Sequence, residues 1–272
     1  MPKSTQEYSM CSETSKIVFD DGAAYERMMG VWSRKVGKHF IDWIGFKSNK
    51  TFADIGCGNA AFSVQLDELC NPKRIAGIDP SEAQIAYAKE IKFNASAEFL
   101  VGDAMQLPYA DNSFDVALMA LVLFFVPDPA KGISEMKRVV NSDGVIAAYA
   151  WDVLGGGLPI EPLHSILRDR DIKYPLPPSK EASQLHVMQK LWVDSGLEEI
   201  ETTSFQVERT FTDFDEYWTV NSNGSSVANL LKAVPHSILE EIKCDLENVL
   251  NRDDENRIVS VASANAVKGI KN

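Results

Sequence analysis

The chain has 272 residues, of which 45% are hydrophobic and 24% charged, a composition typical of a folded globular protein. Its formal net charge is −12, and phosphate backbones repel so acidic a chain, which disfavours nucleic acid as a partner. No apolar run reaches the ~20 residues of a membrane-spanning helix, so we expect no membrane span.

The N-terminal residues and the cysteines indicate the compartment. Residues 1–16 are polar and lack the apolar core of a signal peptide, so we predict a loose tail and no secretion. The cysteines form no CxxC pair, which predicts neither a disulfide framework nor a metal site. They are Cys11, Cys57, Cys70 and Cys244. We expect a reduced, cytoplasmic protein.

Strands and helices alternate in the first half of the chain. Apolar residues at spacings of three and four between Tyr25 and Trp43 predict an amphipathic helix that ends near Gly45. Further helices are predicted over residues 62–69, after Ser81 and over residues 129–140, and a turn is predicted at 141–144. Ser81 has capping-box spacing to Gln84. Short apolar runs predict five strands, over residues 51–55, 74–78, 97–101, 114–120 and 145–151. This alternation is typical of a doubly wound, mostly parallel α/β sheet.

The pattern changes after Trp151. Helices are predicted near 163–168 and 185–195, strands near 200–209 and 257–264, and a helical segment over 214–250. We interpret residues 17–272 as a single domain. Two insertions, about 152–183 and 212–253, are predicted to pack together over the ligand edge of the sheet.

Chemistry-bearing residues stand at the ends of three successive predicted strands. The first strand ends in Asp54-Ile55-Gly56-Cys57-Gly58, whose glycines allow a sharp turn and a close approach of the backbone to a ligand. The second ends in Asp79, where a carboxylate accepts hydrogen bonds from the two hydroxyls of a ribose. The third ends in Asp103, in position to accept from an adenine amino group. Each acid alone also suits a turn or a helix start, but together they favour a nucleoside site.

With these motifs the sequence resembles the class I methyltransferases that use S-adenosylmethionine (SAM). Gly102-Asp103-Ala104 matches the family's adenine motif, and residues 114–128 look like the strand that follows it in the small-molecule branch, which includes quinone-biosynthesis methyltransferases. The resemblance covers about residues 25–151 and continues more loosely to the C-terminus. It implies a Rossmann-like, seven-stranded, mostly parallel sheet with helices on both faces and a C-terminal antiparallel hairpin.

The resemblance also implies roles for individual residues. Asp54 would face the methionine amino group of SAM, Asp79 the ribose, and Asp103 the adenine edge. The remaining cofactor residues implied in this way are Gly56, Cys57, Gly58, Pro80, Ser81, Ala104, Met105, Ala120 and Leu121. Aromatic candidates for the acceptor pocket are Tyr25, Trp32, Phe124, Phe125, Trp151 and Trp218. Each of these aromatic residues also suits a place in the core.

The sequence departs from the family pattern at two places. Ala60 replaces the usual third glycine, which is tolerable if the helix start needs no positive φ. Ala120 and Phe124 stand where relatives often have a polar residue and a histidine. The catalytic residue is therefore left unassigned from the sequence. The acceptor is either deprotonated in solution, or a base comes from the insertions, where the histidines are His164, His186 and His236.

The function predicted is transfer of a methyl group from SAM, by in-line displacement, to a small-molecule acceptor. Two alternatives stay open at this stage: a SAM-binding regulatory protein without catalysis, and a nicotinamide-dependent oxidoreductase, which also uses a glycine turn and an acid. No tyrosine is followed by lysine four residues later, which excludes the short-chain dehydrogenases. SAM chemistry other than methylation, the acceptor atom and the oligomeric state stay open too.

Overall fold

The computed structural model describes residues 26–46, 48–223 and 227–272, and its centre is one large sheet. The strands lie in the order β3-β2-β1-β4-β5-β8-β6, with the short β7 paired to β8. Strands β1 to β5 run parallel, and β8 pairs antiparallel with both β5 and β6. The bounds are β1 Thr51–Ile55, β2 Arg74–Asp79, β3 Ser96–Val101, β4 Phe114–Ala120, β5 Val140–Trp151, β6 Glu198–Phe211, β7 Asn251–Arg252 and β8 Ile258–Ile270. The predicted fold class, with its C-terminal antiparallel hairpin, is confirmed.

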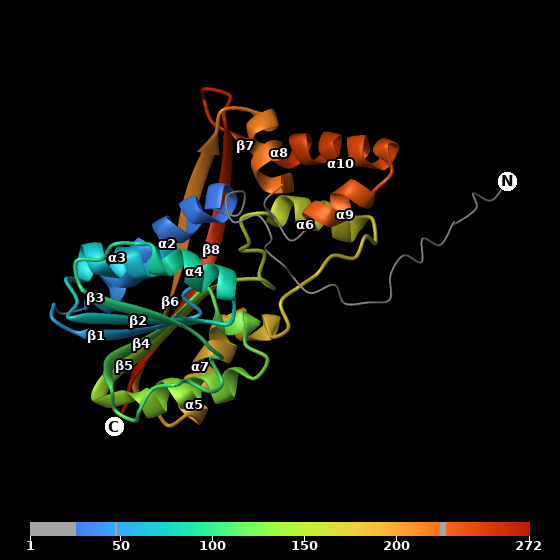
Figure 1. Ribbon diagram of the computed structural model, residues 1–272. Helices are drawn as coiled ribbons and strands as arrows, with labels where there is room; N and C mark the ends of the chain where they lie inside the picture. The colour runs from blue at the N-terminus through green and yellow to red at the C-terminus, as the bar shows by residue number, and fades with distance from the viewer. Residues whose placement is uncertain (1–25, 47, 224–226) are drawn as a thin grey trace.

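Helices cover both faces of the sheet (Figure 1). One face carries α2, α3 and α4, and the other carries α5 and α7. Their bounds are α2 Val31–Ile44, α3 Ala61–Cys70, α4 Glu82–Lys89, α5 Pro129–Val139 and α7 Leu185–Asp194. The central strands are buried from both sides, which is why β1 and β4 are nearly continuous apolar runs.

Local signals set the ends of several of these helices. The Ser81 hydroxyl accepts a hydrogen bond from the Gln84 amide at 3.4 Å, so Ser81 caps α4 as its spacing predicts. Asp128 caps α5 by accepting from the Lys131 amide at 3.1 Å, and Pro129 occupies the first turn. Gly45 ends α2 in the left-handed conformation, with φ of 68°.

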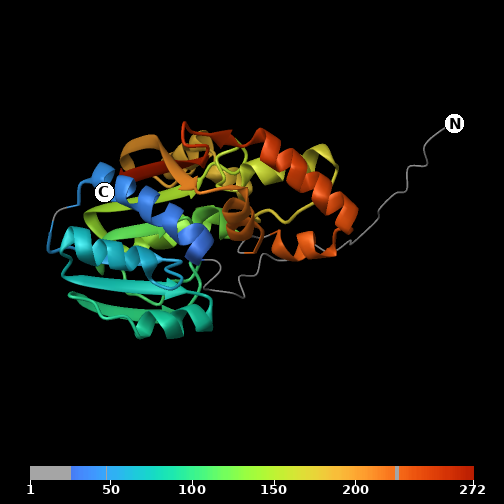
Figure 2. The same cartoon turned by 90° about the horizontal axis from the view of Figure 1, so that it is seen from above.

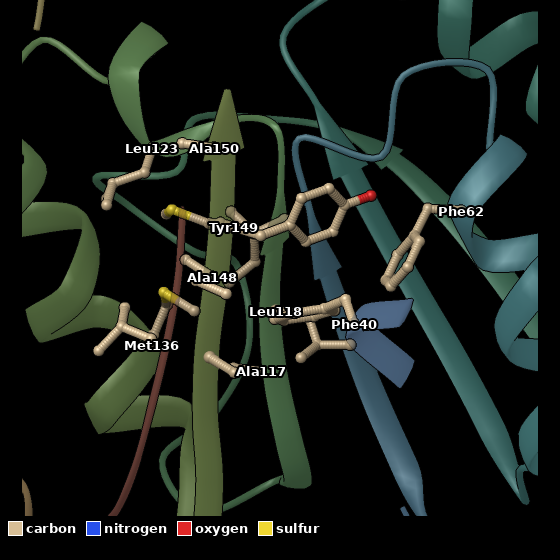
Figure 3. Packing of buried hydrophobic residues seen from close by; sticks show 14 of the residues in the cluster. Phe40, Phe62, Ala117, Leu118, Leu123, Met136, Ala148, Tyr149 and Ala150 are labelled. Atoms are coloured by element: carbon tan, nitrogen blue, oxygen red, sulfur yellow. The ribbon is translucent and has the colours of Figure 1, made fainter. Parts of the chain in front are cut away.

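The large apolar core lies between the sheet and its helices. In Figure 3 the ring of Tyr149 on β5 lies near those of Phe40 and Phe62, with ring centroids 4.6 and 5.8 Å away. On the other face Trp192 of α7 donates from its indole nitrogen to the Ile146 carbonyl at 3.0 Å. The sheet, and with it the ends of its strands, is therefore held rigidly from both sides.

The two insertions form a second group of helices, here called the cap. Figures 1 and 2 show it beside the sheet, at the same end of the molecule in both views. The cap has its own core, which joins Leu163 and Leu167 to Tyr217, Ile242 and Leu246. Its elements are α6 Glu161–Asp169, α8 Phe214–Asn223, α9 Ala228–Ala233 and α10 His236–Val249. The short turn η3 Lys180–Ser183, at the end of the first insertion, packs instead against the large core.

The structure corrects four predicted elements. The turn at 141–144 is a bulge inside β5, because the register to β4 passes from Phe114–Val140 directly to Val116–Val145. The sheet has eight strands and not seven, since β7 adds two residues beside the start of β8. The segment 214–250 divides into three helices, with Pro235 before the last. The N-terminal helix opens with a wider turn, η1 Glu26–Gly30, and becomes α-helical after Gly30, a poor helix former.

Among the helices of the described ranges, none is long and apolar enough to cross a bilayer.

Candidate active site

The carboxyl ends of β1, β2 and β4 surround the larger of two neighbouring cavities, here called the cofactor cavity. It has a volume of about 680 Å³, within the range of small-molecule sites. Eleven of the twelve cofactor residues implied by the resemblance line it: Asp54, Gly56, Cys57, Gly58, Asp79, Pro80, Ser81, Asp103, Ala104, Ala120 and Leu121. The structure thus brings together residues that lie up to 67 positions apart in the sequence, because parallel strands end at one edge of the sheet.

Met105 is the exception among the twelve. Its backbone amide donates to Oδ1 of Asp103 at 2.8 Å, inside the turn that follows β3. Its side chain packs against the large core. The amide of Met105 is thus already paired within the turn, and its implied contact with adenine stays a prediction.

The glycine loop after β1 is fixed by its own backbone. The amides of Gly56 and Cys57 both donate to the Ile78 carbonyl, at 2.7 and 3.0 Å. Gly56 has φ of 75°, and a Cβ there would lie 2.4 Å from the side chain of Val122. Gly58 has φ of 53°, and a Cβ there would meet nothing within 4 Å. Gly56 thus permits close packing beneath the loop, whereas Gly58 presents bare backbone to open space.

Ala60 follows the same loop and corrects an expectation. It starts α3 with φ of 65° and ψ of 20°, in the left-handed region. The helix start therefore does need a positive φ, and alanine adopts it at a cost of ~1–2 kcal/mol. Its methyl group is buried against Ile85, Ala88 and Phe99, which offsets part of that cost.

Asp54 is fully buried at the end of β1. Its Oδ2 accepts from the Ser63 hydroxyl at 2.5 Å, while its Oδ1 has no hydrogen-bond partner. Burial raises the pKa of Asp54 to about 6, the negative charge of Asp79 adds to the rise, and the hydrogen bond from Ser63 opposes it. A buried carboxylate oxygen without a partner, in the wall of a cavity, is a site for a cationic group.

Asp79 is oriented by two backbone amides. Gly58 donates to its Oδ2 at 3.0 Å, and Ser81 donates to its Oδ1 at 2.9 Å. Each carboxylate oxygen keeps a second lone pair for a ligand hydroxyl. An ammonium group at Asp54 and a diol at Asp79 match the two ends of SAM, so the residues present fit this cofactor.

A second, apolar cavity adjoins the first, here called the acceptor cavity. It has a volume of about 80 Å³, and three of the predicted acceptor residues line it: Phe124, Phe125 and Trp151. Leu121 and Phe125 line both cavities, so the two meet beside the end of β4. The rest of its wall comes from Met28 and Met29 of η1 and from the first insertion, with Leu158, Pro159, Ile160, His164, Pro175, Leu176 and Pro177.

The other three aromatic predictions have different outcomes. Trp32 lines neither of these cavities, because it is fully buried in the large core, as the apolar stripe of α2 requires. Trp218 also lines neither, because it packs on Phe214 and under the Lys243 ammonium within the cap. These two positions therefore give no support to the predicted place of Trp32 and Trp218 in the acceptor pocket. Tyr25 lies outside the described residues.

The three histidines of the insertions are separated by the structure. His186 and His236 are exposed and line neither cavity, whereas His164 is buried and lines the acceptor cavity. His39 is exposed on α2. Burial, and after it the charge of Arg168, lowers the pKa of His164 to about 3, so its ring is a weak proton acceptor.

Several lining residues of the cofactor cavity were not predicted from the sequence. Tyr149 lies there because it pairs with Ala120 across β4 and β5, a register that no local pattern gives. Val122 follows the Leu121 turn, and Arg34 comes from α2 and Gln84 from α4. For Arg34, one sequence signal was available: it belongs to the charged and polar residues on the outer face of the first predicted helix, and such residues can contact a ligand.

Comparisons with known proteins agree with this geometry. Residues 53–148 match a family model described as a methyltransferase domain. Demethylmenaquinone methyltransferase of Desulfitobacterium hafniense is 35% identical over 122 residues, which is 43% of this chain and 47% of the relative. The same enzyme of Staphylococcus aureus is 33% identical over 118 residues, with the same coverage of 43% and 47%. The chain thus spans about half the length of the curated relatives it matches.

Solved structures share the fold across most of the chain. The YcgJ protein of Bacillus subtilis aligns with a TM-score of 0.58 at 16% identity, over 88% of this chain and 99% of that one. Phosphoethanolamine N-methyltransferase 2 of Haemonchus contortus, solved with SAM, aligns with a TM-score of 0.56 at 17% identity, over 91% of this chain and 56% of that one. The matched domain, the shared fold and the strand-end motifs thus agree with one another. The chain carries a methyltransferase domain over residues 53–148.

Proposed function

We propose that this protein transfers a methyl group from SAM to a small-molecule acceptor whose reacting part is bordered by apolar groups. One observation carries the proposal: the polar cofactor cavity and the apolar acceptor cavity meet at Leu121 and Phe125. A ligand in each would bring its reacting end to that junction. Such proximity supplies much of the acceleration of a displacement reaction.

The residues of the cofactor cavity would hold SAM as follows. Asp54 would pair with the methionine ammonium group, Asp79 would accept from the ribose hydroxyls, and Asp103 would accept from the adenine amino group. When bound, SAM supplies an electrophilic methyl group on a sulfonium. The thiol of Cys57 stays neutral in this wall, because burial raises its pKa far above the usual range, so it does not compete as a nucleophile.

Orientation and exclusion of water are the contributions of this chain to the transfer step. The side chains at the junction are apolar, and His164 is the one titratable side chain among those lining the acceptor cavity in the described residues. A ring with a pKa of about 3 is a weak general base near neutral pH. The proposal therefore includes an acceptor whose nucleophilic atom is unprotonated in water.

The acceptor of the curated relatives is not assigned to this chain. The matched domain ends at residue 148, before Trp151 and the cap segments that wall the acceptor cavity. A small molecule, rather than a nucleic acid, is the partner proposed, since the net charge of −12 opposes a phosphate backbone. The cytoplasm is the location proposed with it.

Two measurements on the full chain test the proposal. First, SAM and S-adenosylhomocysteine are expected to raise the melting temperature, and NAD is expected to leave it unchanged. A shift with NAD alone would refute the cofactor assignment. Second, incubation with SAM and a panel of small metabolites is expected to form S-adenosylhomocysteine with at least one of them. Cofactor binding without turnover on any acceptor would instead favour a regulatory SAM-binding protein.

A further inference from the structure

The wall of the cofactor cavity carries three acids and a single base. Asp54, Asp79 and Asp103 line the cavity, and Arg34 of α2 is the one cationic side chain among the described residues that line it. The three carboxylates repel an anionic group of a ligand, and the net charge of −12 adds to that repulsion. Arg34 is therefore the side chain that attracts such a group.

Backbone amides near a helix start are the usual alternative for binding an anion. In the glycine loop they are already engaged. Three amides within residues 56–61 donate to backbone carbonyls, at 2.7 to 3.0 Å, and two more donate to side-chain oxygens, at 3.0 and 3.2 Å. They are the amides of Gly56, Cys57, Gly58, Ala60 and Ala61. Each amide has one hydrogen to donate, so these five do not form an anion site.

The fold places Arg34 at the Asp54 end of the cofactor cavity. Helix α2 packs against α3, β6 and β8 (Figure 1), and Nε2 of Gln65 on α3 donates to the Arg34 carbonyl at 2.8 Å. The same helix α3 carries Ser63, whose hydroxyl donates to Asp54 at 2.5 Å. The other two acids follow β2 and β3, which lie farther from β6 and β8 in the sheet than β1 does. Arg34 and Asp54 thus face the same end of a ligand.

The amino-acid end of SAM carries two opposite charges on one carbon atom. The proposed function pairs its ammonium group with Asp54, so its carboxylate lies at the same end of the cavity. The planar guanidinium of an arginine matches the two oxygens of a carboxylate and donates to both. Because Arg34 is exposed, solvent screens its charge and limits the strength of this contact.

We propose that Arg34 binds the carboxylate at the amino-acid end of SAM, so that the cavity selects ligands that carry this group. The inference rests on the proposed function, in which SAM is the ligand. Asp54 and Arg34 form a pair of opposite charges that holds both charged groups of the amino-acid end. A nucleoside that keeps the ammonium group and lacks the carboxylate loses the contact with Arg34.

Two nucleosides that differ only in the carboxylate test the proposal. They are S-adenosylhomocysteine and its decarboxylated form, which keeps the ammonium group. Calorimetry gives the dissociation constants of both for the full chain, and their ratio measures the preference for the carboxylate. In Arg34→Gln this preference is expected to fall about 3- to 10-fold, as the loss of one partly solvated, charge-assisted contact gives. Changes that affect both ligands equally cancel in the ratio.

Lys38→Gln is the matched control. It removes an equal charge from α2, but Lys38 pairs with Asp42 and does not line the cofactor cavity. The preference is expected to stay unchanged in this variant. A preference that stays within about twofold in Arg34→Gln would overturn the proposal, and so would an equal fall in Lys38→Gln.

If Arg34→Gln does not fold, the unmodified chain with ¹⁵N-labelled arginine decides. S-adenosylhomocysteine is expected to shift an arginine side-chain N–H resonance that the decarboxylated form does not shift. Identical arginine resonances with the two ligands bound would overturn the proposal.

The same titrations separate this inference from the proposed function. If S-adenosylhomocysteine binds and the preference is unchanged in Arg34→Gln, the role of Arg34 is refuted and the proposed function stands. An unmodified chain that binds neither nucleoside would refute the proposed function, and the role of Arg34 with it.

Discussion

The two cavities of this protein are built in different ways. The cofactor cavity is walled by carboxylates and backbone amides from short loops at the ends of neighbouring strands. The acceptor cavity is walled by side chains from η1, from the ends of β4 and β5 and from the first insertion, which together span residues 28–177. The difference teaches that a cofactor site depends on local motifs, while an acceptor site depends on how distant segments pack.

The largest expected effect is a loss of cofactor affinity when a residue of the cofactor cavity alone is changed. Asp79→Ala removes the carboxylate proposed to accept from two ribose hydroxyls and leaves the amides of Gly58 and Ser81 without it. We expect its affinity for S-adenosylhomocysteine, measured by calorimetry, to fall by ~1–3 kcal/mol. Asp42→Ala removes an exposed acid of equal charge outside the cavity and serves as the control. Equal losses in the two variants would mean that net charge alone matters.

The next effect concerns pH. Because the pKa of Asp54 is about 6, the carboxylate that pairs with an ammonium group is lost as pH falls through 6. Affinity for S-adenosylhomocysteine is expected to drop about tenfold between pH 7 and pH 5. In the chain without cofactor, the contribution of Asp54 to folding stability changes with pH in the opposite direction. The stability that protonated Asp54 gives below pH ~4 is lost as pH rises through about 6.

The variant Asp54→Asn tests this assignment. It keeps the size of the side chain and does not ionise, so the tenfold step in affinity is expected to disappear. Calorimetric titrations of both chains at pH 5, 6 and 7 provide the measurement. A step of unchanged size in Asp54→Asn would assign the titration to another group.

A smaller effect is expected on the acceptor side. Phe124 is buried in the wall of the acceptor cavity, so Phe124→Leu is expected to reduce the free energy of unfolding by about 1 kcal/mol. Affinity for S-adenosylhomocysteine should stay within twofold, since Phe124 does not line the cofactor cavity. Denaturant unfolding and calorimetry measure the two quantities. If Phe124→Leu lost as much cofactor affinity as Asp79→Ala, the two cavities would be energetically coupled and not independent.

The smallest effect is expected at Ala60. Ala60→Gly relieves a left-handed alanine, worth ~1–2 kcal/mol, but loses a buried methyl group and loosens the unfolded chain. These contributions nearly cancel, so the free energy of unfolding is expected to change by less than ~0.5 kcal/mol. Ala88→Gly, inside α4 and equally buried, is expected to lose ~1.5–2 kcal/mol. Similar losses of unfolding free energy in Ala60→Gly and Ala88→Gly would show that the positive φ of Ala60 does not cost the folded chain stability.

Much of the fold was predictable from sequence because its signals are local. Apolar runs gave β1 and β4 with their observed bounds, and Ser81 gave the start of α4. The strand-end acids gave the cofactor cavity, because parallel strands bring their carboxyl ends to one edge. Trp32 and Trp218 were predicted for the pocket and pack in the two cores, because an aromatic residue on an apolar stripe looks the same whether it faces a core or a pocket.

What the sequence by itself determined is therefore the sheet, its helices and the chemistry of the cofactor cavity, all encoded in runs of a few residues. Only the tertiary structure decided the rest. Strand register placed Tyr149 beside the cofactor cavity, and the conformation of the glycine loop required a positive φ at Ala60. The packing of α6 against α10 and the stacking of Tyr174 on the ring enclosed His164 with both nitrogens unpaired. These features depend on contacts between residues far apart in the chain, which no local pattern specifies.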